Sequence, residues 1–261
     1  MKKYGMLLIM VLVVCFTGCS ENGKKENPIE TQTPIAEMQT PALETQSPDG
    51  KTAEAVLEAK VMEKQGNSYL VINRGEDAKN VQLYTLGSEK ELKVGELVDI
   101  YYNGMVLESY PAQLGEDYGI KKVGEEECLA DLYLNVFKDL YEMDEGLNSD
   151  IEEIALNLEE VSNLSSLEKE YLSYRIWCDY QKETFFSTYE KLKEEGRIID
   201  NSMNYPDGIL VTIKVEEKEE DSFSFSVEKW RSGLGAIGYN NGKAKKEAGK
   251  WSYQPGDFWI S

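Results

Sequence analysis

The chain has 261 residues and no histidine, with 28 Lys and Arg against 48 Asp and Glu, so its formal net charge is −20. The absence of histidine excludes Ser-His-Asp and Cys-His catalysis as well as histidine-ligated zinc. The negative charge disfavours nucleic acid and anionic lipid headgroups as partners, and it favours cations or a basic partner. The sequence contains no phosphate-binding loop, and we expect no cofactor.

The first residues of the chain predict a lipid anchor. Lys2 and Lys3 precede an uninterrupted apolar run over residues 6–16. This run is shorter than the ~20 apolar residues that a membrane-spanning helix needs, and it has the length of a signal-peptide core. It leads into Phe16-Thr17-Gly18-Cys19, where small residues precede a cysteine.

This segment resembles the lipobox of bacterial lipoprotein precursors. The resemblance implies that residues 1–19 carry a lipoprotein signal, that the thiol of Cys19 receives a diacylglycerol group, and that cleavage follows Gly18. We therefore expect a protein held at the cell membrane by its acyl chains and facing outside the cytoplasm. A plain secretory signal and an uncleaved membrane anchor are the alternatives.

Residues 20–52 predict a disordered tether rich in Pro, Thr, Gln and Glu. A seven-residue repeat ends at Pro34, Pro41 and Pro48, and a proline in each unit excludes a coiled coil. The segment has too few large apolar residues to fold. Because residues 1–19 contain two lysines and no acids, the chain that follows them has 26 basic and 48 acidic side chains, a charge of −22.

Residues 53–124 predict a small all-β domain. The turn signals Gln65-Gly66-Asn67 and Asn103-Gly104 each separate two runs with strand character. Five or six short strands in so few residues indicate an OB-like barrel rather than a sandwich. The expected strands are residues 55–64, 68–73, 81–86, 96–102, 105–110 and 118–123.

Two strings in this region, residues 94–104 (VGELVDIYYNG) and 108–113 (ESYPAQ), resemble the YobA-like exported domain, a family of bacterial lipoproteins. The resemblance covers most of residues 54–123, and it implies an OB-like fold and no catalytic residues. Glu108, Tyr110 and Gln113 either line the mouth of the barrel and bind a ligand or form a buried hydrogen-bond cluster. OB barrels often bind oligonucleotides, but that use needs a basic groove.

Residues 125–261 predict an α+β domain. Apolar residues at three- and four-residue spacing predict a helix over residues 128–141, and a half-buried strand is expected over residues 153–161. Ser165 and Glu168 form a capping box that predicts a helix through Cys178, and another helix is expected over residues 184–195. Alternating residues then predict an antiparallel meander over residues 209–216, 222–230, 236–245 and 250–253. Helices packed on such a sheet fit a cystatin-like or NTF2-like arrangement.

Cys128 and Cys178 are the two cysteines in the part expected to fold. They are either buried thiols or, in an extracytoplasmic protein, a disulfide. Two cysteines without histidine do not predict a metal site. The acidic residues 216–221 lack the spacing of an EF-hand, so we expect a solvated turn there rather than a Ca²⁺ site.

The C-terminal region holds the residues most typical of a binding site. Aromatic side chains with an arginine can clamp a sugar ring or a carboxylate-bearing wall peptide. The alternative is that the aromatic side chains fill the core and the arginine pairs with a nearby acid. The candidates are Trp230, Arg231, Tyr239, Trp251 and Tyr253.

These features predict a non-catalytic binding or interaction module of the cell envelope. Its expected contacts are the lipid bilayer through Cys19 and an envelope protein or a wall fragment, and nucleic acid is not expected. Two alternatives stay open, namely an envelope enzyme that uses carboxylates or Arg231, and a purely structural spacer.

Overall fold

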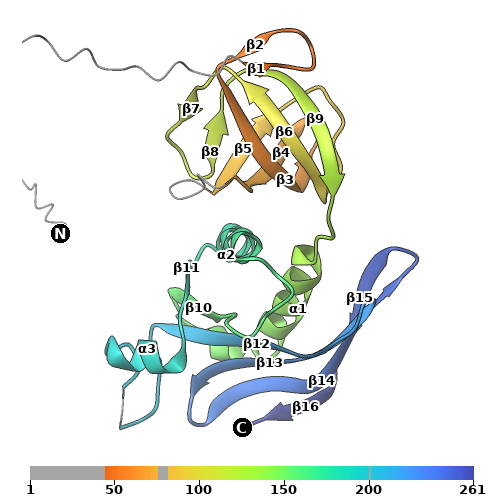
Figure 1. Ribbon diagram of the computed structural model, residues 1–261. Helices are drawn as coiled ribbons and strands as arrows, with labels where there is room; N and C mark the ends of the chain where they lie inside the picture. The colour runs from red at the N-terminus through yellow and green to blue at the C-terminus, as the bar shows by residue number, and fades with distance from the viewer. Residues whose placement is uncertain (1–44, 76–81, 200) are drawn as a thin grey trace, which may run out of the picture. The chain divides into compact units, whose positions relative to one another are not determined.

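The computed structural model describes residues 45–75, 82–199 and 201–261, which belong to one compact unit (Figure 1). The expected signal at residues 1–19 and most of the expected tether lie outside the described residues. The described chain is mostly β, with a seven-stranded mixed sheet followed by an α+β region that contains a curled sheet. At this level the predicted order of an all-β region and an α+β region is confirmed.

The first sheet has the strand order β7-β8-β5-β4-β3-β6-β9. Its strands are β3 Ala55–Gln65, β4 Ser68–Asn73, β5 Leu83–Gly87, β6 Glu96–Tyr102, β7 Val106–Leu107, β8 Ala112–Leu114 and β9 Asp117–Glu125. The β3–β4 hairpin turns at Gly66, whose φ of 63° is a conformation that glycine adopts at little cost. Neighbouring strands are antiparallel except for the parallel pair β5–β8. Alternate side chains such as Val61, Val71, Val98 and Ile100 form the buried core of this sheet.

One expectation for this region is wrong. The turn at Asn103-Gly104 does not join a hairpin, because β6 pairs with β3 and β9, whereas β7 pairs with β8. The side chain of Asn103 accepts a hydrogen bond from the amide of Met105 (3.1 Å), and this local Asx turn redirects the chain. The strand order of the described residues is open, and no closed barrel is found.

Ordered structure also begins earlier than predicted. β1 Thr45–Gln46 pairs with β2 Thr52–Ala53 inside the stretch expected to be a disordered tether. Ser47 is buried, and its hydroxyl accepts a hydrogen bond from the amide of Lys51 (3.1 Å). Short polar side chains of this kind stabilise turns without a large apolar core, which is why composition alone does not reveal the hairpin.

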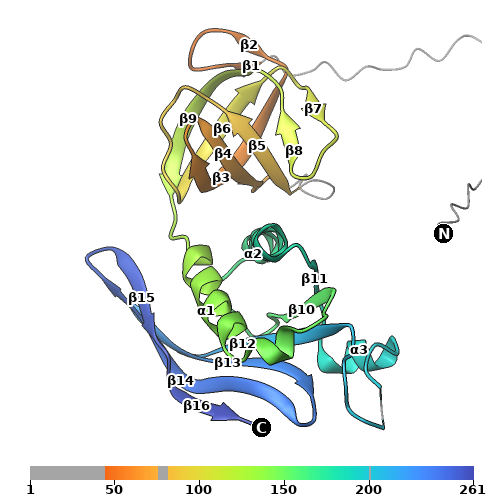
Figure 2. The same ribbon diagram turned by 180° about the vertical axis from the view of Figure 1, so that it is seen from behind.

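The second sheet has the order β11-β10-β12-β13-β14-β15, and β16 also pairs with β14. Figures 1 and 2 show the long strands β12, β13 and β14 curving past helix α1. The apolar stripe of α1 contributes Tyr133, Val136, Phe137 and Leu140 to one core with these strands, as its spacing predicts. The strands are β10 Glu153–Asn157, β11 Glu183–Phe186, β12 Gly208–Lys218, β13 Ser222–Ser232, β14 Gly235–Glu247, β15 Lys250–Gln254 and β16 Asp257–Ile260; the helices are α1 Ala130–Glu142, the 3-10 helix η1 Glu145–Asn148, α2 Ser166–Tyr180 and α3 Tyr189–Glu194.

The helix expected over residues 184–195 is only half present. Its first residues form β11, which pairs in parallel with β10, and the helix α3 begins after Thr188, whose side chain accepts a hydrogen bond from the amide of Lys191. Thr184, Phe185 and Phe186 suit a strand, and pairing with a distant strand decides their conformation. Because β10 is parallel to both β11 and β12, the sheet is mixed, and only β12–β15 form the predicted antiparallel meander.

The predicted capping box of α2 is confirmed, and it makes a second contact. The Ser165 hydroxyl accepts from the amide of Glu168 (3.2 Å), and one carboxylate oxygen of Glu168 accepts from the amide of Ser165 (2.8 Å). The other carboxylate oxygen binds Nζ of Lys60 on β3 at 2.8 Å, in a site where the lysine side chain is 5 % exposed and that of Glu168 10 %. Lys60 also donates to the carbonyl of Glu127 (2.6 Å).

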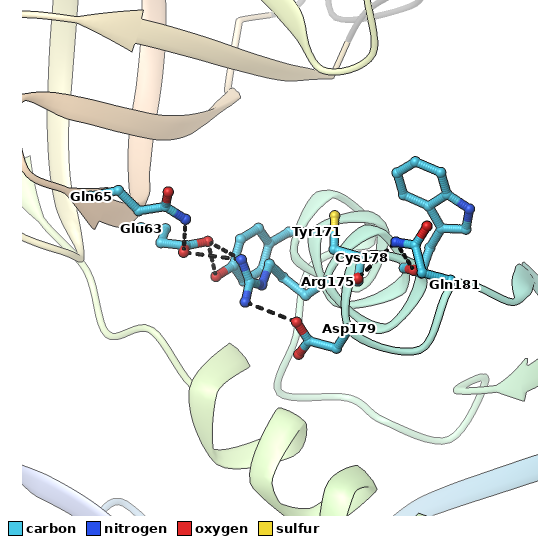
Figure 3. A network of polar contacts seen from close by, with 8 residues as sticks. Glu63, Gln65, Tyr171, Arg175, Cys178, Asp179 and Gln181 are labelled. Atoms are coloured by element: carbon cyan, nitrogen blue, oxygen red, sulfur yellow. Dashed lines mark hydrogen bonds and ion pairs between the residues drawn. The ribbon is translucent and has the colours of Figure 1, made fainter.

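A second polar network links the end of β3 to α2 (Figure 3). NH1 of Arg175 donates to both carboxylate oxygens of Glu63, at 3.0 and 2.9 Å, and NH2 donates to Asp179 at 3.4 Å. Gln65 and the hydroxyl of Tyr171 also donate to Glu63, at 2.7 and 3.4 Å. One buried apolar cluster combines side chains of both regions, namely Met62, Leu70, Ile72, Leu83, Ala130 and Tyr171.

Candidate functional site

The structure does not bring the five candidates of the C-terminal region into one site. Trp230 packs edge-to-face on Tyr189, with ring centroids 5.1 Å apart, in a small apolar cluster. Tyr239 is buried and lies edge-to-face on Phe225, with centroids 5.8 Å apart. Burial raises the pKa of Tyr239, so its hydroxyl stays neutral in the core. The alternative that these aromatic residues fill the core therefore describes Trp230 and Tyr239.

Arg231 holds three segments of the backbone together. Its guanidinium donates to the carbonyls of Leu147 (3.1 Å), Ser149 (2.6 Å) and Pro206 (3.0 Å). The predicted ion pair with an acid does not form among the described residues; backbone oxygens take its place. With these donors engaged, the side chain acts as a structural clamp between η1 and the segment before β12.

Trp251 and Tyr253 share one face of β15, and they line a cavity between this strand and α1. We call this cavity the α1–β15 groove; its volume is about 1090 Å³. Opposite β15 it is bounded by α1 and by the segment that precedes it. The remaining lining residues are Val94, Glu125, Glu126, Glu127, Cys128, Asp131, Leu132, Asn135, Asp139, Lys246, Gly249, Lys250 and Ser252.

Both aromatic side chains of the groove pack against phenylalanine side chains of the core. Trp251 packs against Phe223 with ring centroids 5.3 Å apart, and Tyr253 lies edge-to-face on Phe225 at 5.9 Å. The Tyr253 hydroxyl donates to the carboxylate of Asp139 and lies 3.2 Å from the carbonyl of Asn135. The indole N–H of Trp251 is buried close to the carboxylate of Glu127, in a contact that falls short of a well-aligned hydrogen bond.

The groove is acidic. Five carboxylates line it against two lysines, and one of the lysines, Lys246, already pairs with Glu127 at 2.7 Å. Burial alone would raise the pKa of Glu127, but the hydrogen bond from Lys246, the nearby Trp251 indole and the charges of Lys246 and Lys60 outweigh it and lower that pKa. Burial raises the pKa of Asp131, and the charge of Glu63 adds to the rise. The excess of carboxylates over lysines in the groove favours a cationic ligand.

The candidates of the first region lie elsewhere. Glu108, Tyr110 and Gln113 are exposed, so they do not form the buried hydrogen-bond cluster that was one alternative for them. The hydroxyl of Ser109, between the first two, donates to the carbonyl of Pro111 (2.7 Å) and fixes this loop. Tyr110 lies edge-to-face on Tyr174 of α2 and lines a separate cavity of about 420 Å³.

Ser166 and Lys169 in the first turn of α2 have the Ser-x-x-Lys spacing of some serine nucleophiles. The ammonium group of Lys169 donates to the carbonyl of Leu158 at 2.7 Å. No hydrogen bond joins it to Ser166 among the residues that are described, so the contact by which a lysine activates a serine is missing.

Cys128 and Cys178 are free thiols and form no disulfide, but they are not fully buried as the thiol alternative expected. Both are half-buried, and burial raises the pKa of Cys128 and lowers its reactivity. Within residues 45–75, 82–199 and 201–261, no group of three or more Cys, Asp or Glu side chains is arranged to hold a metal ion. Over the same ranges, no helix has the length and apolarity to cross a membrane.

Comparisons with known proteins gave no match: no family model, no curated protein and no solved structure is significantly similar to this chain. The geometry of the α1–β15 groove is therefore the main basis for a functional assignment.

Proposed function

We propose that this protein is a lipid-anchored envelope protein, attached through Cys19 and facing outside the cytoplasm, whose folded part binds an envelope component without catalysis. The observation that carries the binding role is the α1–β15 groove, where the Trp251 and Tyr253 rings lie beside an excess of carboxylates. Such a groove fits a positively charged segment of an envelope protein or of a wall peptide.

The state of Arg231 favours binding over catalysis. The catalytic alternative depended on this side chain or on an activated carboxylate, and the guanidinium is occupied by three backbone carbonyls. The carboxylates of the groove differ: the net pKa shift of Glu127 is downward, which suits a carboxylate that stays ionised and binds cations, whereas burial raises the pKa of Asp131.

We also propose that the first region has an OB-like fold and that the second region has a cystatin-like or NTF2-like fold. In support of an OB-like first region, β8 and β9 are separated only by Gly115 and Glu116, and this bent segment pairs in parallel with β5 and antiparallel with β6. The β8–β9 segment thus pairs near both ends of the strand order, as in a partly open OB barrel. The packing of α1 on the curled strands β12–β15 supports a cystatin-like or NTF2-like second region. The OB-like fold of the first region agrees with the resemblance of residues 54–123 to the YobA-like exported domain.

The binding role is tested by crosslinking in intact cells that express the full chain. The test variant combines Asp131→Asn with Asp139→Asn in the groove, and the control combines Glu190→Gln with Glu194→Gln on α3, which removes the same charge at exposed positions. We expect the wild type and the control to capture the same wall fragment or protein, and the groove variant to lose at least about tenfold of it. Equal capture by all three contradicts the groove as the site.

The anchor is tested separately by metabolic labelling with a tagged fatty acid. The wild type should incorporate the label and fractionate with membranes, whereas Cys19→Ala should incorporate none. Label in Cys19→Ala, or an isolated wild-type protein that begins at Met1, contradicts the proposed acylation.

A further inference from the structure

A second cavity of about 420 Å³ lies between α2 and β11, and we call it the α2 cage. Its walls are three aromatic side chains and two carboxylates on a polar base. It shares no lining residue with the α1–β15 groove, so a ligand of the α2 cage is independent of the proposed function. The lining residues are Tyr110, Glu170, Ser173, Tyr174, Trp177, Glu183 and Thr184.

The aromatic side chains form a contiguous wall. The rings of Tyr110 and Tyr174 meet at an interplanar angle of 85° with centroids 5.6 Å apart, and Tyr174 is followed by Trp177 with centroids 6.1 Å apart. Yet Tyr110 is 64 % exposed and Trp177 is 42 % exposed. Large aromatic side chains gathered at the surface around a cavity are typical of ligand sites rather than of cores.

Glu170 is the carboxylate within this wall, and it lacks a partner. It is half-buried, and among the described contacts it makes no hydrogen bond and no ion pair. The neighbouring cations are engaged elsewhere, since Lys169 donates to the carbonyl of Leu158 and Arg175 binds Glu63 and Asp179. Desolvation accordingly raises the pKa of Glu170 with no lysine or arginine opposing it.

A half-buried carboxylate beside aromatic faces is an environment that attracts a positive charge. The ring quadrupoles favour a cation over their faces, and Glu170 and Glu183 supply the counter-charge. A neutral sugar ring can stack on the same aromatic side chains, but it leaves Glu170 without a counter-ion. Both phenols are neutral at pH 7, because the ordinary pKa of tyrosine is about 10 and partial desolvation beside the cavity raises the pKa of Tyr110 and of Tyr174 further, so they add no competing charge.

We propose that the α2 cage binds an organic ammonium group, held by cation–π contacts to Tyr110, Tyr174 and Trp177 and by the charge of Glu170. Such a group is carried either by the lysine-type side chain of a peptide or by a small quaternary amine. These two sources share the chemistry of the site and differ in size and in hydrogen-bonding capacity.

Calorimetric titration of the full chain tests this with two matched pairs of probes. Choline is compared with its neutral carbon isostere 3,3-dimethylbutan-1-ol, and N-acetyl-lysinamide is compared with N-acetyl-norleucinamide. We expect at least one cation to bind about tenfold or more tightly than its neutral counterpart. The tighter of the two cations identifies the source. Failure of both cations to bind, or equal affinity of each cation and its neutral partner, overturns the proposal.

Three variants locate the binding. Glu170→Gln keeps the shape of the side chain and removes its charge, Trp177→Leu removes an exposed ring, and Glu194→Gln on α3 is the charge-matched control. We expect the first two to weaken binding of the preferred cation about tenfold each and the control to leave it unchanged. Circular dichroism and thermal melting establish that each variant is folded. Unchanged affinity in a folded Glu170→Gln protein overturns the assignment.

Discussion

The two sides of helix α2 handle polar groups in opposite ways. On one side, Glu168 and Arg175 are buried or half-buried and bind Lys60 and Glu63 of β3. On the other side, Glu170 has no partner among the described residues, and Trp177 stays exposed. A satisfied buried charge keeps elements in place, whereas an unsatisfied one raises the free energy of the folded chain until a ligand supplies its partner. The helix thus carries a structural side and a candidate ligand side.

The largest expected effect comes from breaking the ion pair on the structural side. Lys60→Met leaves the carboxylate of Glu168 buried without a cation, and removing one partner of a buried pair costs about 3–5 kcal/mol. We expect the free energy of unfolding, measured by urea denaturation of full-length protein, to fall by roughly this amount.

A second substitution distinguishes the cost of the unpaired charge from the cost of the lost contacts of Lys60. Glutamine also supports a capping box, so Glu168→Gln added to Lys60→Met removes the stranded charge and keeps the start of α2. We expect the double variant to recover more than half of the lost stability. If it is as unstable as Lys60→Met alone, the cost arises from the lost contacts of Lys60 rather than from the uncompensated charge.

The Arg175 network should matter less because it is more exposed. Arg175→Met keeps most of the apolar stem and removes the paired hydrogen bonds to Glu63, which are worth about 1.5–3 kcal/mol when a charge is involved. The matched control Asp179→Asn weakens only the longer contact at 3.4 Å and should change stability by less than about 0.5 kcal/mol. Equal losses in the two variants contradict a dominant role for Glu63.

The smallest expected effect is a gain in stability rather than a loss. Because desolvation raises the pKa of Glu170 in the folded chain, its ionised form destabilises the fold at pH 7, and Glu170→Gln should raise stability by less than about 1 kcal/mol after solvent screening. The gain should disappear as the pH falls below about 4, where the wild-type carboxylate is protonated in both states. Thermal melting of both proteins between about pH 3.5 and 7 measures this difference. A loss of stability at pH 7 contradicts the view that Glu170 is unsatisfied.

Local signals in the sequence predicted much of the fold. The capping box at Ser165 and Glu168, the stripe of α1 and the hairpin at Gly66 each depend on residues a few positions apart. The pairing of strands that are far apart in the chain could not be predicted from such local signals. Residues 184–186 suit a strand, but their parallel partner lies on β10, far away in the chain, so the sequence alone predicted them as part of the helix that follows.

In the candidate sites, too, local sequence patterns predict one part, and the other part depends on tertiary contacts. Trp251 and Tyr253 are two residues apart on one strand, so their common face is predictable from alternation alone. Their carboxylate neighbours in the groove come from α1 and the segment before it, far away in the chain. The α2 cage was missed because Tyr110 belongs to the first region and Trp177 to the second, and only tertiary contacts bring them to one cavity.

The Glu168 carboxylate makes two contacts, so the opening of the first turn of α2 is coupled to the detachment of β3. One of its oxygens closes the first turn of α2, while the other holds Lys60 on β3. Fraying of that turn and detachment of β3 therefore break the same carboxylate contacts. We expect the protected amides of β3 and of α2 to exchange with deuterium through one shared opening, so that this helix and this strand behave as a single cooperative folding unit even though more than a hundred positions separate them in the chain.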